Sequence, residues 1–455
     1  MNKINPEIFR SYDIRGKYPD ELNEEAAYRT ARAFGIYLKK DLKKPLPLKV
    51  VLGQDMRVHS PFLAREVMRG LNDEGVLVID IGEVPTPAFM YAVSFKDFAG
   101  GVMVTASHNP KQYNGLKITR EKGIPVGLDS GLDKIRDYAL GELPKPEGKG
   151  NFQQLKNIVS EYVEQELSFV NIPKLKRFKV VADTANAMGA MYLDEFFKRV
   201  DLEVTKLNWE LNGNMPIHEA NPYKPETLQQ LREVVKNEHA DLGIATDGDG
   251  DRIGFLDEKG DTIRGDITGA IIAKRLLERN PGAKIGFEVR SSRIVAETIK
   301  QNGGVPVLMP AGYAKMKPLM SREDVLFAAE SSMHYMFREN YNHESPVFVI
   351  SVLLSIMSEQ EKPLSEIWRE YLKYFHSGEQ NFSVTDKEAV LKKLEKKYQN
   401  GKISHLDGVT VEFDDWWFNA RASNTEPVLR LNLEADSEEL MKEKLKEVSG
   451  LITSL

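Results

Sequence analysis

The sequence predicts an α/β protein in which three similar α/β domains, with mixed and largely parallel sheets, precede a C-terminal α+β domain around a central cleft. A strand-helix-strand pattern occurs three times along the chain. The matching last strand of each pass ends in a polar loop, and the pattern changes after about residue 373. The expected domains are residues 1–150, 151–254, 255–370 and 371–455.

The first pass shows the repeating pattern. Apolar spacing predicts helices over residues 24–40 and 61–72 and strands over residues 48–53, 76–82 and 99–104. In the second helix, Leu63, Val67 and Leu71 fall on one face. Strand, helix, strand is the crossover unit of a parallel sheet.

The same order returns in residues 179–246 and again in residues 283–330. Ligands of open parallel sheets bind beyond the carboxyl ends of the strands, so the three polar loops could converge on one cleft. The C-terminal residues have a different pattern, with short strands over 380–384, 408–413, 416–422 and 428–433, a helix over 387–398 and a final helix from 437. This pattern is typical of an antiparallel α+β domain.

Composition narrows the class of protein. The chain has 455 residues, of which 41% are hydrophobic and 29% charged, with a formal charge of −6. The acidic balance gives no sign of nucleic-acid binding, so any anion that the protein binds is expected to be small. The absence of cysteine excludes disulfides and thiolate metal sites. No signal peptide and no apolar run of membrane-spanning length are found, and we expect a cytoplasmic monomer with no membrane partner.

Ser107 stands where a predicted strand ends. The glycine-bounded apolar run 99–104 leads into Thr-Ala-Ser-His-Asn-Pro. Asn109-Pro110 turns the chain away from strand pairing, and Asn114-Gly115 is expected to make a second turn that brings Lys117 back toward the serine. A positioned hydroxyl beside a lysine suits phosphoryl transfer, which usually also needs a divalent metal. A polar turn with no chemical role is the competing interpretation.

Three carboxylates, those of Asp247, Asp249 and Asp251, occupy alternate positions in Asp-Gly-Asp-Gly-Asp-Arg. Alternate side chains of an extended segment share a face, so all three can reach one hard cation. An EF-hand calcium loop would use the same residues with Glu258, but Arg252 holds the position that needs glycine and both flanks resemble strands. A solvated acidic turn without metal is the other alternative.

Three further loops carry polar groups with two interpretations each. In the segment 9–16, Arg10 and Arg15 beside Tyr12 could bind a phosphate or belong to surface ion pairs. Glu330-Ser-Ser-Met-His334 could hold sugar hydroxyls or begin a helix capped by Ser332. Arg421-Ala-Ser-Asn-Thr-Glu-Pro427 could cradle a phosphate or be a plain turn.

Together, in this order and spacing, the five motifs resemble those of the α-D-phosphohexomutases, and the closest branch is that of the bacterial phosphomannomutase/phosphoglucomutases. The resemblance covers essentially the whole chain. It implies four domains around a central cleft. It also implies Mg²⁺-dependent movement of phosphate between O1 and O6 of a hexose, with a hexose 1,6-bisphosphate as primer.

The resemblance implies a role for each matching residue. Ser107 would be a phosphoserine that donates to the sugar, giving a bisphosphorylated intermediate that turns over and returns its other phosphate. Asp247, Asp249 and Asp251 with the Ser107 phosphate would hold Mg²⁺. The candidate proton-transfer and charge-stabilising groups are Lys117, Arg15 and His334. The implied substrate-binding residues are Tyr12, Arg252, Arg290, Tyr313, Lys317, Glu330, Ser331, Ser332, Met333, His334, Arg421, Ala422, Ser423, Asn424 and Thr425.

Three departures from the family pattern affect the expected substrate. Ala329 and Met333 replace two glycines of the sugar loop, Tyr313 stands where many members have histidine, and Arg290 stands where lysine is common. The Ser-Asn-Thr-Glu-Pro ending favours the mannose/glucose branch over the glucosamine branch. The alternatives are a phosphoglucosamine-type mutase and a non-catalytic phosphosugar-binding regulator.

Overall fold

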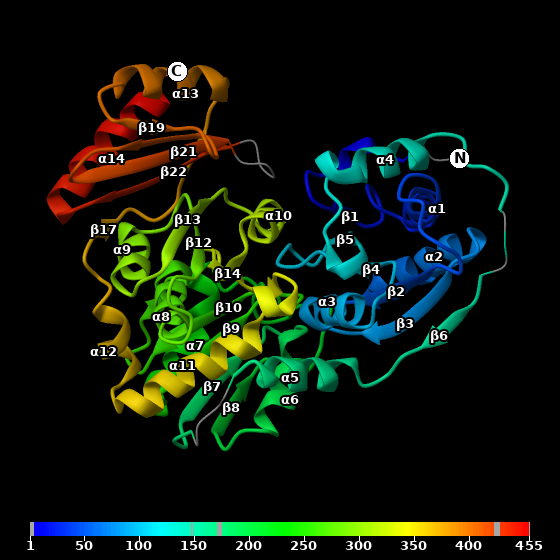
Figure 1. The fold of residues 1–455 in the computed structure, drawn as a ribbon, viewed down its shortest axis with the longest axis horizontal. Helices are drawn as coiled ribbons and strands as arrows, with labels where there is room; N and C mark the ends of the chain where they lie inside the picture. The colour runs from blue at the N-terminus through cyan, green and yellow to red at the C-terminus, as the bar shows by residue number, and fades with distance from the viewer. Residues whose placement is uncertain (1–3, 147, 149, 171–174, 423–427, 455) are drawn as a thin grey trace. The chain divides into compact units, whose positions relative to one another are not determined.

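The computed structural model describes residues 4–146, 148, 150–170, 175–422 and 428–454 (Figure 1). By its contacts the chain divides into two compact units. Unit 1 comprises Met1–Ile263 and His334–Ser365, and unit 2 comprises Arg264–Met333 and Glu366–Leu455.

The first sheet of unit 1 has the strand order β1-β5-β4-β2-β3-β6. Its elements are β1 Ile14–Lys17, α1 Glu24–Lys40, β2 Lys49–Gln54, α2 Ser60–Asp73, β3 Leu77–Glu83, α3 Thr86–Phe95, β4 Gly100–Val104, β5 Tyr113–Arg120, α4 Asp133–Leu140 and β6 Phe152–Gln154. Strand β2 pairs in parallel with β3 and β4, whereas β5 runs antiparallel to both β4 and β1. A buried apolar core that includes Phe34, Leu52 and Val67 joins helices to sheet.

One predicted turn is absent from this sheet. Asn114 and Gly115 lie inside β5 rather than in a turn, and the chain reverses between Ser107 and Tyr113 instead. Gly115 is needed for close approach, because a Cβ there would lie 2.3 Å from the carbonyl oxygen of Ile14 and 2.7 Å from that of Thr105. Antiparallel pairing of β5 with β4, rather than a turn at Asn114-Gly115, brings Lys117 back along the strand that precedes Ser107.

The second sheet of unit 1 has the order β11-β10-β9-β7-β8. Its elements are α5 Ile158–Ser168, β7 Lys179–Asp183, α6 Gly189–Phe197, β8 Glu203–Leu207, α7 Gln229–Asn237, β9 Leu242–Thr246, β10 Ile253–Asp257 and β11 Thr262–Ile263. Strands β7, β8 and β9 are parallel, and β10 reverses direction against β9. Unit 1 also holds the hairpin β15 Tyr335–Phe337 and β16 His343–Glu344, followed by the apolar helix α11 Pro346–Gln360.

Unit 2 begins with helix α8 Gly265–Leu277 and contains three parallel strands. The remaining elements of this part are β12 Lys284–Glu288, α9 Arg293–Gln301, β13 Val305–Met309, α10 Tyr313–Glu323 and β14 Val325–Ala329, with β12 between β13 and β14. Helix α12 Leu364–Arg369 crosses the boundary between the units.

The C-terminal part of unit 2 is an antiparallel sheet with two helices. Its elements are β17 Phe375–His376, β18 Gln380–Ser383, α13 Lys387–Lys397, β19 Lys402–Ser404, β20 Val409–Glu412, β21 Trp416–Ala422, β22 Val428–Ala435 and α14 Glu438–Thr453. The predicted fold class, three α/β sheets followed by an α+β domain, is confirmed. Among the helices of the described ranges, none is long and apolar enough to cross a membrane.

Candidate active site

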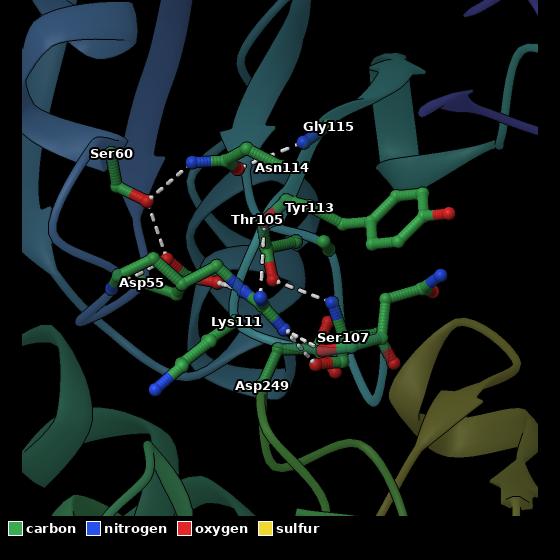
Figure 2. A network of polar contacts seen from close by, with 12 residues as sticks. Asp55, Ser60, Thr105, Ser107, Lys111, Tyr113, Asn114, Gly115 and Asp249 are labelled. Carbon is green, nitrogen blue, oxygen red and sulfur yellow. Dashed lines mark hydrogen bonds and ion pairs between the residues drawn. The ribbon is translucent and has the colours of Figure 1, made fainter. Parts of the chain in front are cut away.

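Ser107 lies in the loop between β4 and β5 of unit 1. Its backbone φ is 48°, in the left-handed region, and its side chain is buried. Its backbone N–H donates to Thr105 Oγ1 at 3.0 Å, and its own Oγ donates to Asp247 Oδ2 at 2.9 Å. Figure 2 shows the contact between Thr105 and Ser107. The hydroxyl therefore faces the acidic loop that follows β9.

The three aspartates form one buried group in the loop between β9 and β10. One ligand oxygen from each of Asp247, Asp249 and Asp251 lies within 4.8 Å of the others. Strands rather than helices flank the loop, which excludes the EF-hand alternative. Gly250 supplies the bend with a φ of 74°, which a residue with a side chain adopts only under strain.

The carboxylates of this group differ in proton affinity. Burial and the neighbouring charges of Asp251 and Asp249 raise the pKa of Asp247 to about 7. Although burial acts in the same direction at Asp249, the charge and hydrogen bond of Lys117 outweigh it and lower the pKa of Asp249 to about 2. The repulsion at Asp247 is what a bound cation would relieve.

The donor set fits a hard divalent metal such as Mg²⁺. Asp249 Oδ1 and Asp251 Oδ1 are buried and accept no hydrogen bond from the described residues. Carboxylate oxygens are the ligands that such ions prefer, and three of them fill only part of an octahedral shell. The group can therefore hold a metal and leave positions for an anionic ligand.

Two predicted basic residues lie beside this group. Lys117 Nζ, on β5, contacts Asp249 Oδ2 at 2.6 Å and Asp251 Oδ2 at 2.7 Å. Arg15, on β1, donates to the carbonyl of Ala106 at 2.6 Å and to the side chain of Asn109, and pairs with Asp13 at 2.7 Å. The structure thus brings both cations to the loop of Ser107.

His334 reaches the same group from the start of the second segment of unit 1. Its Nε2 accepts a hydrogen bond from Arg252 Nε at 3.0 Å. Its Nδ1 therefore carries the proton in the neutral ring and faces Asp251 Oδ1 at 3.7 Å and Glu344 Oε1 at 3.5 Å. Tyr12 is half-buried in the bend before β1.

Several contacts of this site were not predicted from the sequence. Thr86 Oγ1, at the start of α3, donates to Asp249 Oδ2 at 2.6 Å. His108 Nδ1 lies 3.2 Å from Ser107 Oγ, and burial together with Arg252 and Arg15 holds its pKa well below the usual value, so the ring is neutral. Arg57, which is fully buried, contacts the backbone of the Ser107 loop. The one sequence signal for a role of Arg57 is its position just after a predicted parallel strand, in Gln54-Asp-Met-Arg57.

The predicted sugar loop lies in unit 2 apart from His334. Glu330 Oε1 accepts from the N–H of Gly312 at 2.5 Å, and Glu330 Oε2 accepts from Ser332 Oγ at 3.0 Å. The N–H of Ser331 donates to Glu288 Oε1 at 3.0 Å. The segment is a turn, so the alternative of a capped helix is wrong. Met333 is buried with a φ of 71°.

Arginines of unit 2 converge on one carboxylate, that of Glu379. Arg421 donates to Glu379 Oε2 at 3.0 Å, Arg290 donates to the same oxygen at 3.3 Å, and Arg430 lies 3.4 Å from Glu379 Oε1. These three charges outweigh burial and lower the pKa of Glu379. The cluster links the end of β12 to the end of β21, where Ala422 is exposed. Ser423, Asn424 and Thr425 lie outside the described residues.

Lys317 and Tyr313 lie together on α10. The ammonium of Lys317 is buried and stands 5.0 Å from the centre of the Tyr313 ring, a cation–π distance. Unit 2 therefore groups its predicted residues around the ends of β12, β14 and β21 and the start of α10.

Comparison with protein families matches four successive segments of the chain. They are phosphoglucomutase/phosphomannomutase alpha/beta/alpha domain I at residues 6–142, domain II at 160–260, domain III at 264–375 and the C-terminal domain at 379–450. The predicted four-domain order agrees with these matches, whereas the predicted boundaries stay a prediction.

Curated relatives match over nearly the whole chain. A phosphomannomutase of Methanocaldococcus jannaschii is 38% identical, covering 98% of each chain, and one of Vibrio cholerae is 36% identical with the same coverage. Among solved structures, a phosphoglucomutase/phosphomannomutase family protein of Burkholderia thailandensis has a TM-score of 0.90 at 28% identity, covering 99% of this chain and 98% of that one.

Proposed function

This chain belongs to the phosphoglucomutase/phosphomannomutase family of phosphate-transferring mutases, and we propose that it interconverts the 1-phosphates and 6-phosphates of glucose and mannose through a phosphoserine at Ser107. The observation that carries the proposal is the hydrogen bond from Ser107 Oγ to Asp247 at 2.9 Å. It places the hydroxyl at an acidic group suited to a divalent metal.

In the proposed reaction the bond between phosphorus and Ser107 Oγ breaks as a bond forms between phosphorus and a sugar hydroxyl oxygen. The sugar hydroxyl gives up a proton and the serine oxygen takes one up. Lys117, His334 and Arg15 are the proposed proton-transfer and charge-stabilising groups, because all three surround the Ser107 loop or its acidic partner. The resulting bisphosphorylated sugar then returns its other phosphate to the serine.

Asp247, Asp249 and Asp251, with the Ser107 phosphate, would hold Mg²⁺, which supplies positive charge to the transferring phosphoryl group. The buried oxygens of Asp249 and Asp251 that accept no hydrogen bond from the described residues support this assignment. A hexose 1,6-bisphosphate would prime the enzyme by phosphorylating Ser107.

The proposed sugar-binding residues belong to several loops. Glu330 and Ser332 would bind O3 and O4 in either orientation, and the loop from Arg421 to Thr425 would bind the phosphate that is not reacting. The other proposed substrate-binding residues are Tyr12 and Arg252 of unit 1 and Arg290, Tyr313 and Lys317 of unit 2. Ser331, Met333 and Ala422 would contribute through their loops. The function is proposed for a cytoplasmic monomer.

Two alternatives remain for test. The first alternative is a phosphoglucosamine-type mutase, because Ala329, Met333 and Tyr313 leave the choice of sugar open, whereas the similarity to phosphomannomutases favours mannose. A regulator that binds phosphosugars without turnover is the second alternative.

The test is the intact mass of the purified protein before and after a chase with sugar phosphate. A mass excess of one phosphoryl group that moves to the sugar, and that Ser107→Ala abolishes, is the expected result. Competitive turnover of glucose, mannose, glucosamine and N-acetylglucosamine phosphates then identifies the substrate. If wild type binds glucose 1-phosphate but never converts it with Mg²⁺ and a bisphosphate primer, the regulator is correct.

A further inference from the structure

Arg57 is a fully buried arginine just beyond the end of β2. Its guanidinium donates to three backbone carbonyls of the loop after β4, those of Ser107 at 2.8 Å, Asn109 at 2.6 Å and Pro110 at 2.9 Å, and to the carbonyl of Tyr113, the first residue of β5, at 3.0 Å. Its Nε donates to Asp55 Oδ2 at 3.1 Å. One side chain thus satisfies carbonyls across the whole connection between β4 and β5.

This connection needs such a partner. Ser107 has a φ of 48°, and a residue with a side chain in that region costs about 1–2 kcal/mol. The strain persists only if surrounding contacts over-determine the conformation. Buried carbonyls without a donor would add a further cost, so the guanidinium both satisfies and shapes the loop.

We propose that Arg57 is a positioning residue, which holds the Ser107 loop in its strained conformation so that the serine oxygen faces Asp247. The proposal rests on the proposed function, because it assigns Arg57 a part in phosphoryl transfer from Ser107. Arg57 acts through the backbone of the loop and stays separate from the sugar.

A chain of hydrogen bonds through Asp55 holds the guanidinium of Arg57 in place. The carboxylate of Asp55 accepts from Ser60 Oγ at 2.5 Å, and Ser60 Oγ accepts from Asn114 Nδ2 at 2.9 Å. Figure 2 shows this chain of contacts from Asn114 through Ser60 to Asp55. These hydrogen bonds connect the start of α2 to β5, the strand that also carries Lys117.

Close backbone packing also confines the Ser107 loop and the segment that carries Arg57. A Cβ at Gly248, in the acidic loop, would lie 2.2 Å from the carbonyl oxygen of Ser107. A Cβ at Gly213 would lie 2.5 Å from both Met56 O and Val58 N. Close backbone approach therefore confines the Ser107 carbonyl at Gly248 and the segment that carries Arg57 at Gly213.

An arginine suits this position better than a lysine. Its planar fork presents five N–H donors in fixed directions, and each of them is needed for the four carbonyls and Asp55. A lysine has a compact ammonium with three donors, so Arg57→Lys keeps the charge and loses the spread of contacts. This variant therefore separates positioning from charge.

The test compares Arg57→Lys with Arg32→Lys. Arg32 is a matched control, since it is also buried in unit 1 and also bonds a carboxylate, Glu74, and a carbonyl, that of Pro144. For Arg57→Lys we expect kcat and the rate of phosphoryl transfer from Ser107 to fall by about tenfold or more, with KM changed less than about twofold, because misplacement of a reacting group affects the transition state. Arg32→Lys should leave both constants near wild type.

Hydrogen exchange of residues 106–114 gives a second measurement that does not depend on turnover. Exchange there should rise in Arg57→Lys and stay unchanged in Arg32→Lys. If Arg57→Lys does not fold, Ser60→Ala takes its place, because it removes a hydrogen bond to Asp55 and leaves Arg57 intact. Ser60→Ala should lower kcat and raise hydrogen exchange of residues 106–114 by smaller amounts. Wild-type kcat together with wild-type exchange in a folded Arg57→Lys variant would overturn the proposal. If the wild-type protein carries no transferable phosphate, the proposed function is wrong. The hydrogen-exchange measurement then still tests whether Arg57 holds the Ser107 loop.

Discussion

A single methyl group at Gly248 should disturb the reacting serine. Because a Cβ at Gly248 would lie 2.2 Å from the carbonyl oxygen of Ser107, Gly248→Ala must displace one of the two loops. We expect turnover to fall by about tenfold or more, as for other small misplacements of catalytic groups. Steady-state kinetics check this. Gly450→Ala is the control. A Cβ at Gly450, on α14, has no neighbouring atom within 4 Å, so this variant should keep full activity.

Removal of any one aspartate of the acidic group should abolish most turnover. Asp247→Ala, Asp249→Ala or Asp251→Ala removes charge that the proposed Mg²⁺ requires, so we expect a loss of orders of magnitude. Chelation of metal from wild type should have the same effect, and added Mg²⁺ should restore activity. Full activity of a variant in metal-free buffer would contradict this.

At the residue scale, the site residues that could be identified from the sequence are those that belong to short motifs. Ser107, Lys117 and the three aspartates lie together as expected, because each belongs to a polar loop or to the strand beside it. Arg57 and Thr86 were missed because neither belongs to one of the five motifs, although Arg57 lies only 50 positions from Ser107. Contacts to backbone carbonyls, such as those of Arg57, give no pattern of residue types. Thr86 instead contacts a side chain, that of Asp249 in the loop after β9.

The sugar-loop turn illustrates a competition between backbone strain and burial. Met333 has a φ of 71°, and Met333→Gly would relieve about 1–2 kcal/mol of strain. Deleting its buried side chain would cost about 2–5 kcal/mol. Because the lost burial outweighs the relieved strain, we expect the free energy of unfolding to decrease, as measured by urea denaturation of the variant and wild type. An unchanged or increased stability would show that Met333 packs poorly.

The arginine cluster at the end of β21 should serve substrate binding more than chemistry. Arg421→Ala leaves Glu379 paired with Arg290 and Arg430, so the cluster should persist. We expect KM for the sugar phosphate to rise by about tenfold or more and kcat to change little, because the contact is made equally in ground and transition states. Arg322→Ala, whose side chain is 74% exposed, is the control. A large fall of kcat with unchanged KM would refute the assignment.

At the element scale, amphipathic helices were predictable, and helices that are buried nearly all round were not. The period of residues 24–40 gave α1 with its observed bounds. Helices α3 and α11 were not predicted, because both are buried nearly all round and show no polar face. The Asn114-Gly115 pair was expected in a turn because of its residue types, yet close packing against Ile14 and Thr105 holds it inside β5.

At the scale of the whole molecule, the threefold repetition predicted the class of fold, but grouping of segments could not be predicted. Residues His334–Ser365 belong to unit 1, although Met333 and the sugar-loop residues before it belong to unit 2. Long-range hydrogen bonds join this segment to the rest of unit 1. Glu166 on α5 accepts from Asn340 Nδ2 at 2.8 Å and from the N–H of Phe348 at 3.1 Å. Such pairings leave no local signal in the sequence.

The same glutamate should make the stability of the molecule depend on pH. Burial raises the pKa of Glu166 to about 8, against about 4.3 for an unfolded glutamate. Between these values the folded state binds more protons than the unfolded state, so this group lowers the free energy of unfolding as pH rises from about 4 to 8. In Glu166→Gln that contribution disappears, and the stability of the variant relative to wild type should increase steadily from about pH 5 to about pH 8.

Urea denaturation at fixed metal concentration measures this trend. Glu195→Gln is the control, because hydrogen bonds from Lys198 and Arg199 lower the pKa of Glu195 to about 2, below the range. Parallel pH profiles for wild type and Glu166→Gln would mean that Glu166 is ionised in the folded protein. The two N–H donors of Asn340 and Phe348 would then have outweighed burial and would hold the second segment of unit 1 through a charged contact.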